Sequence, residues 1–396
     1  MTALDAQATP VGDLDPFGDD FLEDPYQAHR DLREAGCAVW LERYRVWAMA
    51  RHEQVDAALR DPETYCSRRG VGLTDFAWRP PSLLLEADPP DHTRARRAIT
   101  AVLSPRTVKA MRENFASEAG TMVDRLVTRG RFDGVADLAA AFPLKVMPDQ
   151  VGLPPDGREN LLPYGNLAFN AFGPRNARLE LAMSTAAPAS AWIAECTRRE
   201  NLAPAGIGAR IHEAAQAEDF AEPEGELLVR SVLTAGLDTT VHALGNALLC
   251  FAAHPDQWTQ LRQEPALARA AFEEVIRFES PVQTFFRTTT RGARVEDLKL
   301  PEGEKMLLFL AAANRDPRRW EDPDRFDIRR PASGHVGFGS GIHACVGQMI
   351  ARLEGQVVLA ALAKRVARIE FDGQPRRQLN NTLRGLDSLP LKVTGA

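Results

Sequence analysis

The chain has 396 residues, of which 44% are hydrophobic and 26% are charged. This composition is ordinary for a globular protein, and the length is enough to bury a large core. Lys and Arg total 48 against 54 Asp and Glu, which gives a net charge of −6. A mildly acidic chain lacks the excess of cations that neutralises phosphates, so no nucleic-acid partner is expected.

The cysteines and the N-terminus predict where the protein works. Five cysteines stand at positions 37, 66, 196, 250 and 345 without the regular spacing of a disulfide scaffold. The first twenty residues carry early acidic residues and no apolar segment, so they do not predict a signal peptide. No run of 18 apolar residues predicts a membrane span. We therefore expect a cytoplasmic protein that contacts no membrane, with a monomer as the default oligomeric state.

The first half of the chain predicts helices and one small hairpin. Residues 24–36 predict a helix that opens with an Asp–Pro pair and stops at a glycine. Alternating apolar residues over 37–50 predict the hairpin. Residues 105–130 have helical spacing and end on a glycine. Residues 161–176 contain Gly and Pro, and predict a broken helix flanked by loops and outside the core.

The second half predicts the centre of the fold. Residues 224–255 predict a single helix of roughly 45 Å. It is apolar nearly all round and should therefore cross the core. Residues 293–310 predict a second small sheet, and residues 346–370 a strong amphipathic helix. We expect one domain over residues 1–396, mainly α with minor β, with a flexible tail at 1–15.

Polar and flexible residues interrupt the long predicted helix at Ala235–Thr240, which reads AGLDTT. A glycine inside a helix costs about 1 kcal/mol relative to alanine. Threonine can bond to the carbonyl four residues back and bend the helix. One interpretation is a packed glycine with satisfied polar side chains. The other is a groove for a small molecule, where Asp238 and Thr239 are available to move protons.

A single cysteine, Cys345, stands among four glycines just before the last predicted helix. The positive end of a helix favours a thiolate and should lower the pKa of Cys345. The glycines leave room for a flat, large group beside the sulfur. A lone thiolate in such a slot suggests haem with an axial cysteine ligand. A buried structural cysteine and a nucleophile with His343 as its base are the alternatives.

The ten residues Phe338–Gly347 (FGSGIHACVG) resemble the haem-ligand signature of the cytochromes P450. Further stretches agree with that family in order and spacing. They are Ala235–Thr240, which resembles its oxygen groove; Glu274–Arg277, which resembles its ExxR motif; Asp322–Phe326, whose arginine completes the ExxR triad; and Ala87–Arg96, which resembles the helix that holds a haem propionate.

The resemblance implies the single-domain cytochrome P450 fold, with haem b between the long central helix and the helix that follows the cysteine ligand. Cys345 is then the fifth iron ligand, Thr239 holds water and bound oxygen, and Asp238 relays protons from solvent. The residues implied at the propionates are His92, Arg96, Arg287 and His343, with His335 competing for the last place; Ala235, Phe338 and Gly347 also border the cofactor. Glu274, Arg277 and Arg325 are implied to be structural and to lock the loop beneath the haem.

The same resemblance implies a monooxygenase that uses O2 and receives electrons singly. Because the chain carries no flavin or reductase motif, it is similar to bacterial members served by an iron–sulfur ferredoxin and its NADH-dependent reductase. Arg94, Arg97 and Lys109 are candidates for the ferredoxin-docking surface.

The spacing along the central helix suggests a substrate. Arg230, Thr234 and Asp238 lie on one helix face, and Arg230 and Ser231 stand about 10–12 Å from the oxygen groove. One aromatic ring fits that distance, so a small aromatic acid could place its carboxylate at Arg230 and Ser231. An ion pair between Arg230 and Glu226 is the alternative.

A closer resemblance supports the acid. Five stretches are similar to the bacterial subfamily that oxidises para-substituted benzoates: WRPPSLLLEADPP, LLPYGNLAFNAFGP, LLVRSVLTAGLDTT, FESPVQTFFRTTTR and NNTLRGLDSLP. The positions implied at the carboxylate are Arg79, Ser82, Arg230 and Ser231, and those at the aromatic walls are Phe169, Phe172 and Phe285. The chain departs from the pattern at Thr234, where serine is expected, and in a shorter segment at 75–78.

Three activities follow from these resemblances. The first is oxidative O-demethylation or hydroxylation of para-substituted benzoates such as 4-methoxybenzoate. The second is hydroxylation of a neutral terpenoid or polyketide, which an apolar pocket without Arg79 and Arg230 would favour. The third is a haem-thiolate sensor without catalysis, against which Asp238 and Thr239 argue because a sensor needs no proton delivery.

Overall fold

The computed structural model describes residues 14–74 and 80–396. Arg79 and nearly all of the predicted flexible tail therefore lie outside the described residues. The helices are α1 (Asp19–Glu23), α2 (Tyr26–Ala35), α3 (His52–Arg60), α4 (Asp91–Val102), α5 (Pro105–Arg129), α6 (Ala141–Val151), α7 (Leu161–Asn170), α8 (Ala177–Thr185), α9 (Ala187–Cys196), α10 (Ile207–Ala217), α11 (Glu222–Gly236), α12 (Asp238–Ala253), α13 (Pro255–Gln263), α14 (Ala268–Glu279), α15 (Leu310–Ala313) and α16 (Gln348–Arg365).

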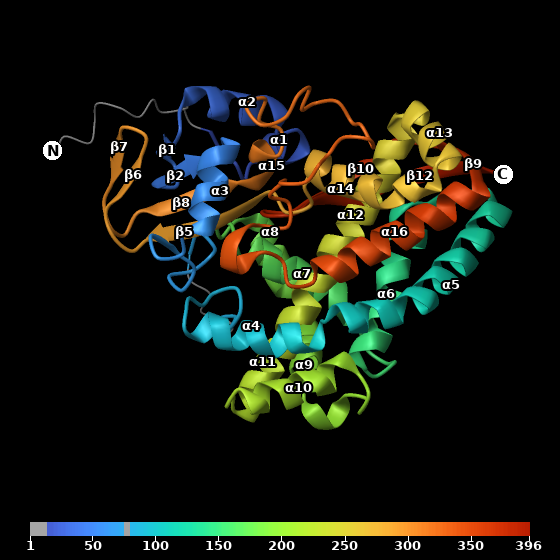
Figure 1. Cartoon of the computed structure of the whole chain (residues 1–396), viewed down its shortest axis with the longest axis horizontal. Helices are drawn as coiled ribbons and strands as arrows, with labels where there is room; N and C mark the ends of the chain where they lie inside the picture. Colours follow the sequence, from blue (N-terminus) through green and yellow to red (C-terminus); the bar gives the residue numbers. More distant parts are fainter. Residues whose placement is uncertain (1–13, 75–79) are drawn as a thin grey trace.

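The strands are β1 (Val39–Leu41), β2 (Val46–Met49), β3 (Tyr65–Cys66), β4 (Arg131–Asp133), β5 (Thr284–Thr289), β6 (Ala293–Val295), β7 (Leu298–Leu300), β8 (Lys305–Phe309), β9 (Val366–Phe371), β10 (Arg376–Leu379), β11 (Arg384–Ser388) and β12 (Pro390–Gly395). The strands β1, β2, β5, β6, β7 and β8 lie at one end of the molecule, and β9 and β12 lie near the C-terminus at the other end (Figure 1). The largest sheet has the order β1-β2-β8-β5-β3, and its β2–β8 pair is parallel. Smaller sheets join β4-β12-β9, β10-β11 and β6-β7.

Several predicted elements are confirmed. α2 lies within residues 24–36, and β1 and β2 form the antiparallel hairpin predicted over 37–50. α5 ends before Gly130, whose φ of +71° is the left-handed conformation that glycine favours at a helix end. The sheet predicted over 293–310 is confirmed as the β6–β7 hairpin, although β8 joins the large sheet instead.

The long helix predicted over 224–255 is wrong at its centre. The chain forms α11 and α12, and the helix breaks at Leu237, where φ is −99° and ψ is −67°. The hydroxyl groups of Thr239 and Thr240 donate to the carbonyls of Ala235 and Gly236, at 2.8 and 3.0 Å. These two bonds satisfy carbonyls next to the break, which is how threonine bends a helix.

Two other predictions are wrong because tertiary packing overrides the local pattern. The helix predicted outside the core at 161–176 is α7, and its Leu161, Tyr164 and Leu167 are buried in the main hydrophobic core. The helix predicted over 346–370 ends at Arg365, because the following residues form β9 and pair with β12. α16 packs against both α5 and α14, so it is buried on more than one side.

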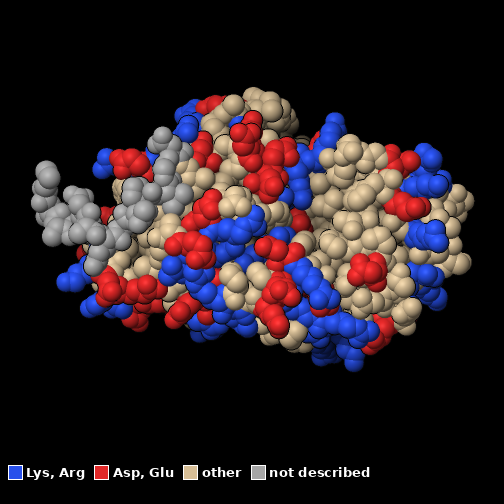
Figure 2. All heavy atoms as spheres, turned by 90° about the horizontal axis from the view of Figure 1, so that it is seen from above, with Lys and Arg blue, Asp and Glu red and all other residues tan. Residues whose placement is uncertain are grey.

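The surface agrees with the modest net charge. Figure 2 shows Lys and Arg interspersed with Asp and Glu over one face of the molecule. Within residues 14–74 and 80–396, no helix has the length and apolar character needed to cross a membrane.

Candidate functional site: a haem-binding cavity

A large cavity lies where α11 and α12 face the loop that precedes α16. Its empty space is about 1850 Å³, including the part that opens to solvent. The cavity runs without interruption from Ser82 and Arg230 at one end to Cys345 at the other, so a cofactor and a substrate can lie in it side by side. The residues predicted at the site that line it are Ser82, Arg96, Phe169, Phe172, Arg230, Ser231, Thr234, Ala235, Thr239, Phe285, Arg287, Phe338, His343, Cys345 and Gly347.

The loop around Cys345 is a tight turn whose backbone geometry depends on glycine. The N–H of Cys345 donates to the carbonyl of Phe338 at 2.8 Å and closes the loop. Gly339 and Gly341 have φ values of +69° and +64°. A Cβ on Gly341 would also lie 2.5 Å from the carbonyl oxygen of Leu59, so no side chain fits there.

The prediction that the pKa of Cys345 is lowered is wrong. Burial is the largest effect on this thiol and raises its pKa. The backbone N–H groups of Gly347 and Gln348 and the charges of Arg352 and Arg96 lower it by less. The helix end therefore stabilises a thiolate without outweighing burial. A bound metal cation deprotonates a coordinating thiol outright.

Four basic side chains gather beside Cys345. Arg96, Arg287 and His343 line the cavity, and the rings of His92 and His343 lie 4.4 Å apart. Arg287 is only 2% exposed and donates to the carbonyl of Phe286 at 2.7 Å. Burial lowers the pKa of Arg287 to about 10. Burial and these neighbouring cations lower the pKa of His343 to about 2.

This cluster fits the two propionates of haem. Both ring nitrogens of His92 and Nε2 of His343 are buried, and no described residue hydrogen-bonds to them. Buried polar groups are costly without partners, and a carboxylate nearby would favour the charged imidazolium. Within residues 14–74 and 80–396, no group of three or more His, Cys, Asp or Glu side chains could hold a metal ion. Haem iron needs a single axial ligand from the protein here.

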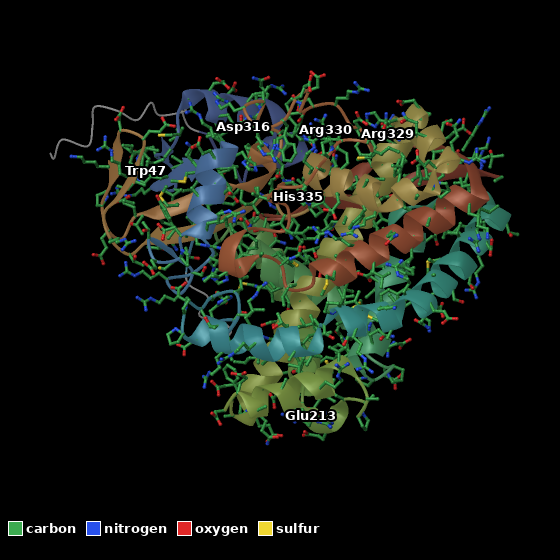
Figure 3. The ribbon with its side chains drawn as sticks, viewed as in Figure 1. Trp47, Glu213, Asp316, Arg329, Arg330 and His335 are labelled. Carbon is green, nitrogen blue, oxygen red and sulfur yellow. The ribbon has the colours of Figure 1, made fainter. Side chains whose placement is uncertain are left out.

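His335, the competitor of His343, lies elsewhere. Its Nε2 is 3.0 Å from Glu273 on α14, and its Nδ1 accepts from the N–H of Gly337. Burial opposes the charge on Glu273, but His335 and Arg352 outweigh it and lower the pKa of that carboxyl to about 2. Figure 3 shows His335 on the segment between α15 and α16, beside α14.

The ExxR pair is present, but its predicted third member is wrong. Arg277 and Glu274 are fully buried and form two hydrogen bonds of 2.7 and 2.8 Å. Arg325 contributes only its carbonyl oxygen, which accepts from Arg277, while its side chain is 65% exposed. Arg330 donates to Glu274 at 3.2 Å instead. The four intervening residues turn back toward α14, so the later arginine reaches the carboxylate.

Asp238 and Thr239 face different surroundings. Thr239 lines the cavity, as does Thr240. The carboxyl of Asp238 packs against α7, where a Cβ on Gly165 would overlap its Oδ2. Asp238 is 7% exposed, and burial raises its pKa well above the usual range. The direct contact with solvent expected of a proton relay is thus not seen at this carboxyl.

Sequence reasoning missed a second buried acid, Glu354 on α16. It is 1% exposed, lines the cavity, and leaves Oε1 without a described hydrogen-bond partner. Burial raises the pKa of Glu354 to about 8, although a hydrogen bond with Thr240 acts in the opposite direction. The sequence carries little signal for this acid, because the polar residues Arg352 and Gln356 lie two positions to either side of it.

Polar side chains meet at the opposite end of the cavity. The hydroxyl oxygens of Ser82 and Ser231 lie 3.0 Å apart, although the two residues are far apart in the chain. Arg230 is half-buried rather than buried, and its guanidinium donates to the carbonyl of Pro80 at 3.0 Å. Thr234 lines the cavity between the two ends, and its hydroxyl donates to the carbonyl of Arg230.

Three phenylalanines from separate elements form one wall. The ring centroids of Phe169 and Phe172 are 5.8 Å apart, and those of Phe172 and Phe285 are 5.6 Å apart. Both pairs meet edge to face, and Leu383 packs against the first pair. Such rings orient a flat aromatic ligand through further edge and face contacts.

Comparison with known proteins covers nearly the whole chain. The cytochrome P450 family profile matches residues 197–386. Cytochrome P450 CYP199A2 of Rhodopseudomonas palustris is 56% identical over 388 residues, which cover 97% of this chain and 94% of that protein. Cytochrome P450 107B1 of Saccharopolyspora erythraea is 32% identical over 96% of this chain and 98% of its own length. The structure of CYP109Q5 from Chondromyces apiculatus has a TM-score of 0.82 at 29% identity, covering 97% of this chain and 98% of that one.

These findings confirm the resemblance drawn from the motifs. The fold is the predicted one, mainly helical with minor sheet. The cofactor is haem iron with a cysteine thiolate ligand, and the reaction class is that of a monooxygenase. With full-length relatives at 56% and 32% identity and a cavity that fits haem, the chain belongs to the cytochromes P450.

Proposed function

We propose that the protein oxidises small aromatic acids, with para-substituted benzoates such as 4-methoxybenzoate as substrates. One observation carries the proposal: a single cavity joins a pair of serines and an arginine at one end to Cys345 and Thr239 at the other. The phenylalanine wall lies along the same cavity. The closer resemblance to the benzoate-oxidising subfamily supports the same reading.

The substrate carboxylate binds at the serine end. The hydroxyls of Ser82 and Ser231 can each donate to a carboxylate, and Arg230 supplies a positive charge on the same helix. Hydrogen bonds to an ionised acceptor are about twice as strong as neutral ones. A neutral terpenoid or polyketide would desolvate this end of the cavity without offering an ionised acceptor to it, so the polar end disfavours that alternative. Arg79 is proposed as a further cation for this end.

At the other end, Cys345 is the proposed iron ligand, and His92, Arg96, Arg287 and His343 hold the propionates. The haem supplies the activation of dioxygen. Thr239 lines the cavity, and its Oγ1 can hold a water molecule and pass a proton toward the substrate side. Asp238 is proposed to exchange protons with Thr239 through the break between α11 and α12.

The overall reaction balances with two electrons and two protons for each O2. One oxygen atom enters a C–H bond of the methoxy methyl group, and the other leaves as water. The resulting hemiacetal then breaks its C–O bond to give formaldehyde and 4-hydroxybenzoate. A para substituent without that methyl group would be hydroxylated instead.

The electrons come from NADH through a ferredoxin and its reductase, which places the proposed reaction in the cytoplasm. Two of the cations predicted to dock the ferredoxin are engaged within the protein. Arg97 pairs with Glu218 at 2.8 Å, and Arg94 stacks on Phe220 at 4.0 Å. Lys109 is exposed on α5. Docking is therefore expected to use Lys109 more than the two arginines.

The first test is a visible-spectrum titration of the ferric protein with 4-methoxybenzoate and its methyl ester. Binding of the acid near the iron displaces water and shifts the spin state from low to high. We expect a response to the acid that the ester lacks. A response to neither ligand would contradict the proposal and favour a larger neutral substrate.

Matched serine variants locate the carboxylate. Ser231→Ala should weaken binding of the acid by about tenfold, the size of one charge-assisted hydrogen bond. The hydroxyl of Ser231 donates to the carbonyl of Leu227 in its own helix. Ser184→Ala is the control, because Ser184 on α8 likewise donates to a carbonyl of its own helix but lies on the surface. Product formation from the acid with ferredoxin, reductase and NADH separates an enzyme from a haem-thiolate sensor.

A further inference from the structure

Two stretches that resemble the benzoate-oxidising subfamily carry asparagines that have no role in the chemistry proposed above. LLPYGNLAFNAFGP forms α7 and the loop after it, and NNTLRGLDSLP forms the turn between β10 and β11 and then β11. The structure brings the helix end and this turn into contact. The contact consists of hydrogen bonds among the amides of Asn166, Asn170, Asn176, Asn380 and Asn381.

Asn381 joins both ends of the loop that carries Phe172. Its Nδ2 donates to the carbonyl of Asn170 at 2.8 Å, just before that loop. Its Oδ1 accepts from Nδ2 of Asn176 at 2.9 Å, just after the loop. Its backbone N–H donates to Oδ1 of Asn170 at 3.0 Å. A single residue of the turn thus fixes the distance between the ends of α7 and α8.

Asn380 makes the turn itself rigid. Its Oδ1 accepts from the N–H groups of Thr382 and Leu383, at 2.9 and 3.0 Å. Its Nδ2 donates to Oδ1 of Asn166, one helical turn before Asn170. Side-chain bonds of this kind hold a turn in one conformation. The turn that carries Asn381 is therefore held in one conformation.

The loop and the turn lie in direct contact. A Cβ on Gly173 would be 2.5 Å from Cβ of Asn381, so the backbone next to Phe172 lies against this side chain. Leu383, in the same turn, packs against Phe169 and Phe172 and pairs with Val282. The turn therefore supports the back of the phenylalanine wall, whose front faces the cavity.

The position of Phe172 depends on this contact more than on its own helix. α7 ends at Asn170, so Phe169 is held by helical geometry and Phe172 is not. Apolar packing alone is non-directional, whereas hydrogen bonds fix a distance and an angle. Asn381 is 2% exposed, and a buried amide group that loses its partners is costly, which keeps these bonds formed.

We infer that Asn381 is a positioning residue that sets how far the phenylalanine wall reaches into the cavity. It thereby sets the preference of the cavity for a flat ring. The inference rests on the proposed function, because it assigns a selectivity determinant to the proposed substrate pocket. Asn381 acts through Phe172 and has no contact with substrate in this role.

The experiment measures how Asn381→Ala changes discrimination between flat and thick acids. Spin-state titrations of the haem protein with 4-methoxybenzoate and with 3,4,5-trimethoxybenzoate give two dissociation constants. We expect the dissociation constant of 3,4,5-trimethoxybenzoate, divided by that of the flatter 4-methoxybenzoate, to fall by about tenfold in Asn381→Ala. This is the size of one lost hydrogen bond. Asn201→Ala is the control, because Asn201 also donates its amide to a carbonyl and a carboxylate, but away from the cavity. Its ratio should stay within about twofold of wild type.

A milder variant protects the test against loss of folding. Asn176→Asp keeps the acceptor that caps α8 and removes the donor to Asn381. We expect the ratio of the two dissociation constants to fall in this variant as well, but by less than in Asn381→Ala. Hydrogen exchange of the backbone over 171–176 should become faster in both variants. Intact haem binding is checked by the absorption of the ferrous carbon monoxide complex, because a general loss of structure would lower that signal rather than change a ratio.

A second pair of ligands separates this inference from the proposed function. Imidazole and 4-phenylimidazole bind haem iron directly and need no carboxylate site. If neither acid shifts the wild-type spectrum, the proposed function fails, and the imidazole pair still tests Asn381. Asn381→Ala should then weaken 4-phenylimidazole several-fold while leaving imidazole unchanged. Unchanged ratios for both pairs, with unchanged exchange over 171–176, would overturn the inference.

Discussion

Thr239 combines a place in the cavity wall with a hydroxyl that stabilises the break between α11 and α12. Removing the hydroxyl should leave haem and substrate binding in place, because neither depends on it. Proton delivery to activated oxygen should suffer, since a positioned proton donor contributes at least about a hundredfold in rate.

We therefore predict that Thr239→Ala diverts electrons from product into hydrogen peroxide. Product formed per NADH should fall roughly tenfold or more. The assay compares NADH consumption, peroxide and product in the reconstituted system. Thr239→Ser keeps the hydroxyl and should retain coupling. Equal coupling in wild type and Thr239→Ala would remove Thr239 from the mechanism.

Glu354 gives a pH dependence whose sign follows from its burial. The pKa of this carboxyl is raised from its usual 4.5 to about 8, chiefly by burial. The folded protein therefore holds the proton more tightly than the unfolded chain does. The associated stability is complete below about pH 4.5 and is lost as the pH rises toward 8.

The prediction concerns Glu354→Gln, which keeps a neutral side chain of similar shape. Between pH 5 and 8, the wild type should lose up to about 1.4 kcal/mol of unfolding free energy per pH unit relative to the variant. Urea unfolding of both proteins at several pH values measures this difference. Parallel curves would show that Glu354 ionises in the folded state near its ordinary pKa.

At the scale of elements, the approach of α7 to α12 decides the shape of the site. Gly165 lets the two helices come so close that the Asp238 carboxyl occupies the space of a Cβ. Without this approach, Asp238 would have more room and Phe169 would stand farther from the cavity. The side-chain volume at position 165 of α7 therefore affects both the proposed proton relay and the position of the phenylalanine wall.

We predict that Gly165→Ala destabilises the protein by about 1–3 kcal/mol, the usual cost of overpacking. Gly245→Ala is the matched control on α12, because a Cβ there would meet Ala139 and Val135 at an ordinary 3.8 and 3.9 Å. That change should be neutral or stabilising by up to about 1 kcal/mol, since alanine favours a helix. Denaturant unfolding measures both values. Equal effects would show that α7 moves away from α12 without cost.

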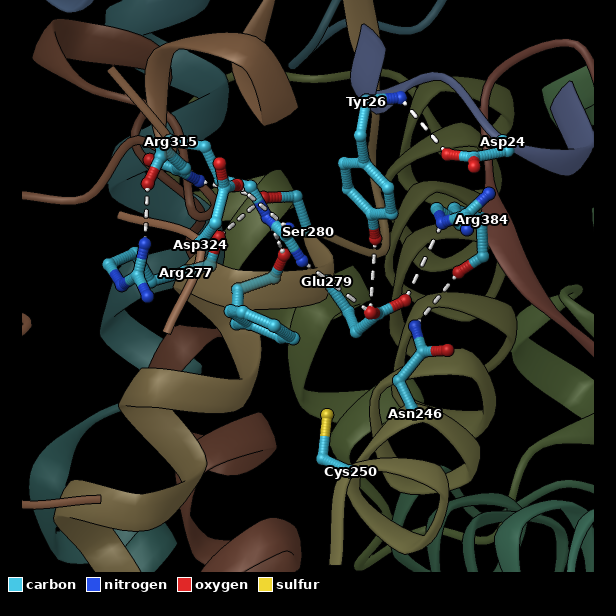
Figure 4. Close-up of polar contacts among 12 residues, drawn as sticks. Asp24, Tyr26, Asn246, Cys250, Arg277, Glu279, Ser280, Arg315, Asp324 and Arg384 are labelled. Atoms are coloured by element: carbon cyan, nitrogen blue, oxygen red, sulfur yellow. Dashed lines mark hydrogen bonds and ion pairs between the residues drawn. The ribbon is translucent and has the colours of Figure 1, made fainter. Parts of the chain in front are cut away.

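At the scale of the whole molecule, a buried ion cluster joins the two ends of the chain. Glu279, at the end of α14, accepts from Tyr26 of α2 at 3.0 Å. Arg315, Arg377 and Arg384 lie 3.2–3.7 Å from its carboxylate. Figure 4 shows Glu279 between Tyr26 and Arg384. Burial would raise the pKa of Glu279, but the three arginines outweigh it and lower the pKa.

Removing the central charge should therefore affect the stability of the whole fold. We predict that Glu279→Gln lowers the free energy of unfolding by about 3–5 kcal/mol, because it leaves buried arginines uncompensated. Tyr26→Phe removes one hydrogen bond and should cost about 1 kcal/mol. Urea unfolding compares the two variants. A loss below that of Tyr26→Phe would mean that solvent or other carboxylates neutralise the arginines.

The sequence by itself determined the features that depend on neighbouring residues. The Cys345 loop needs glycine at fixed positions because the backbone there has positive φ. These glycines can be recognised directly in the sequence. Glu274 and Arg277 meet because residues three apart share a helix face. The helices at 24–36 and 105–130 follow from end signals and apolar spacing, which are equally local.

Only the tertiary structure decided contacts between distant segments and the burial of single charges. Arg330 rather than Arg325 reaches Glu274, because the path of the loop sets the distance. Asp238 is buried because α7 packs over it, and Glu354 is buried because α16 packs against α12; the pKa of each carboxyl is raised by that burial. Asn381 meets Asn170 across the fold for the same reason. Electrostatic interactions and hydrogen bonds depend on distance and burial. Both are set by tertiary packing and cannot be read from the order of residues alone.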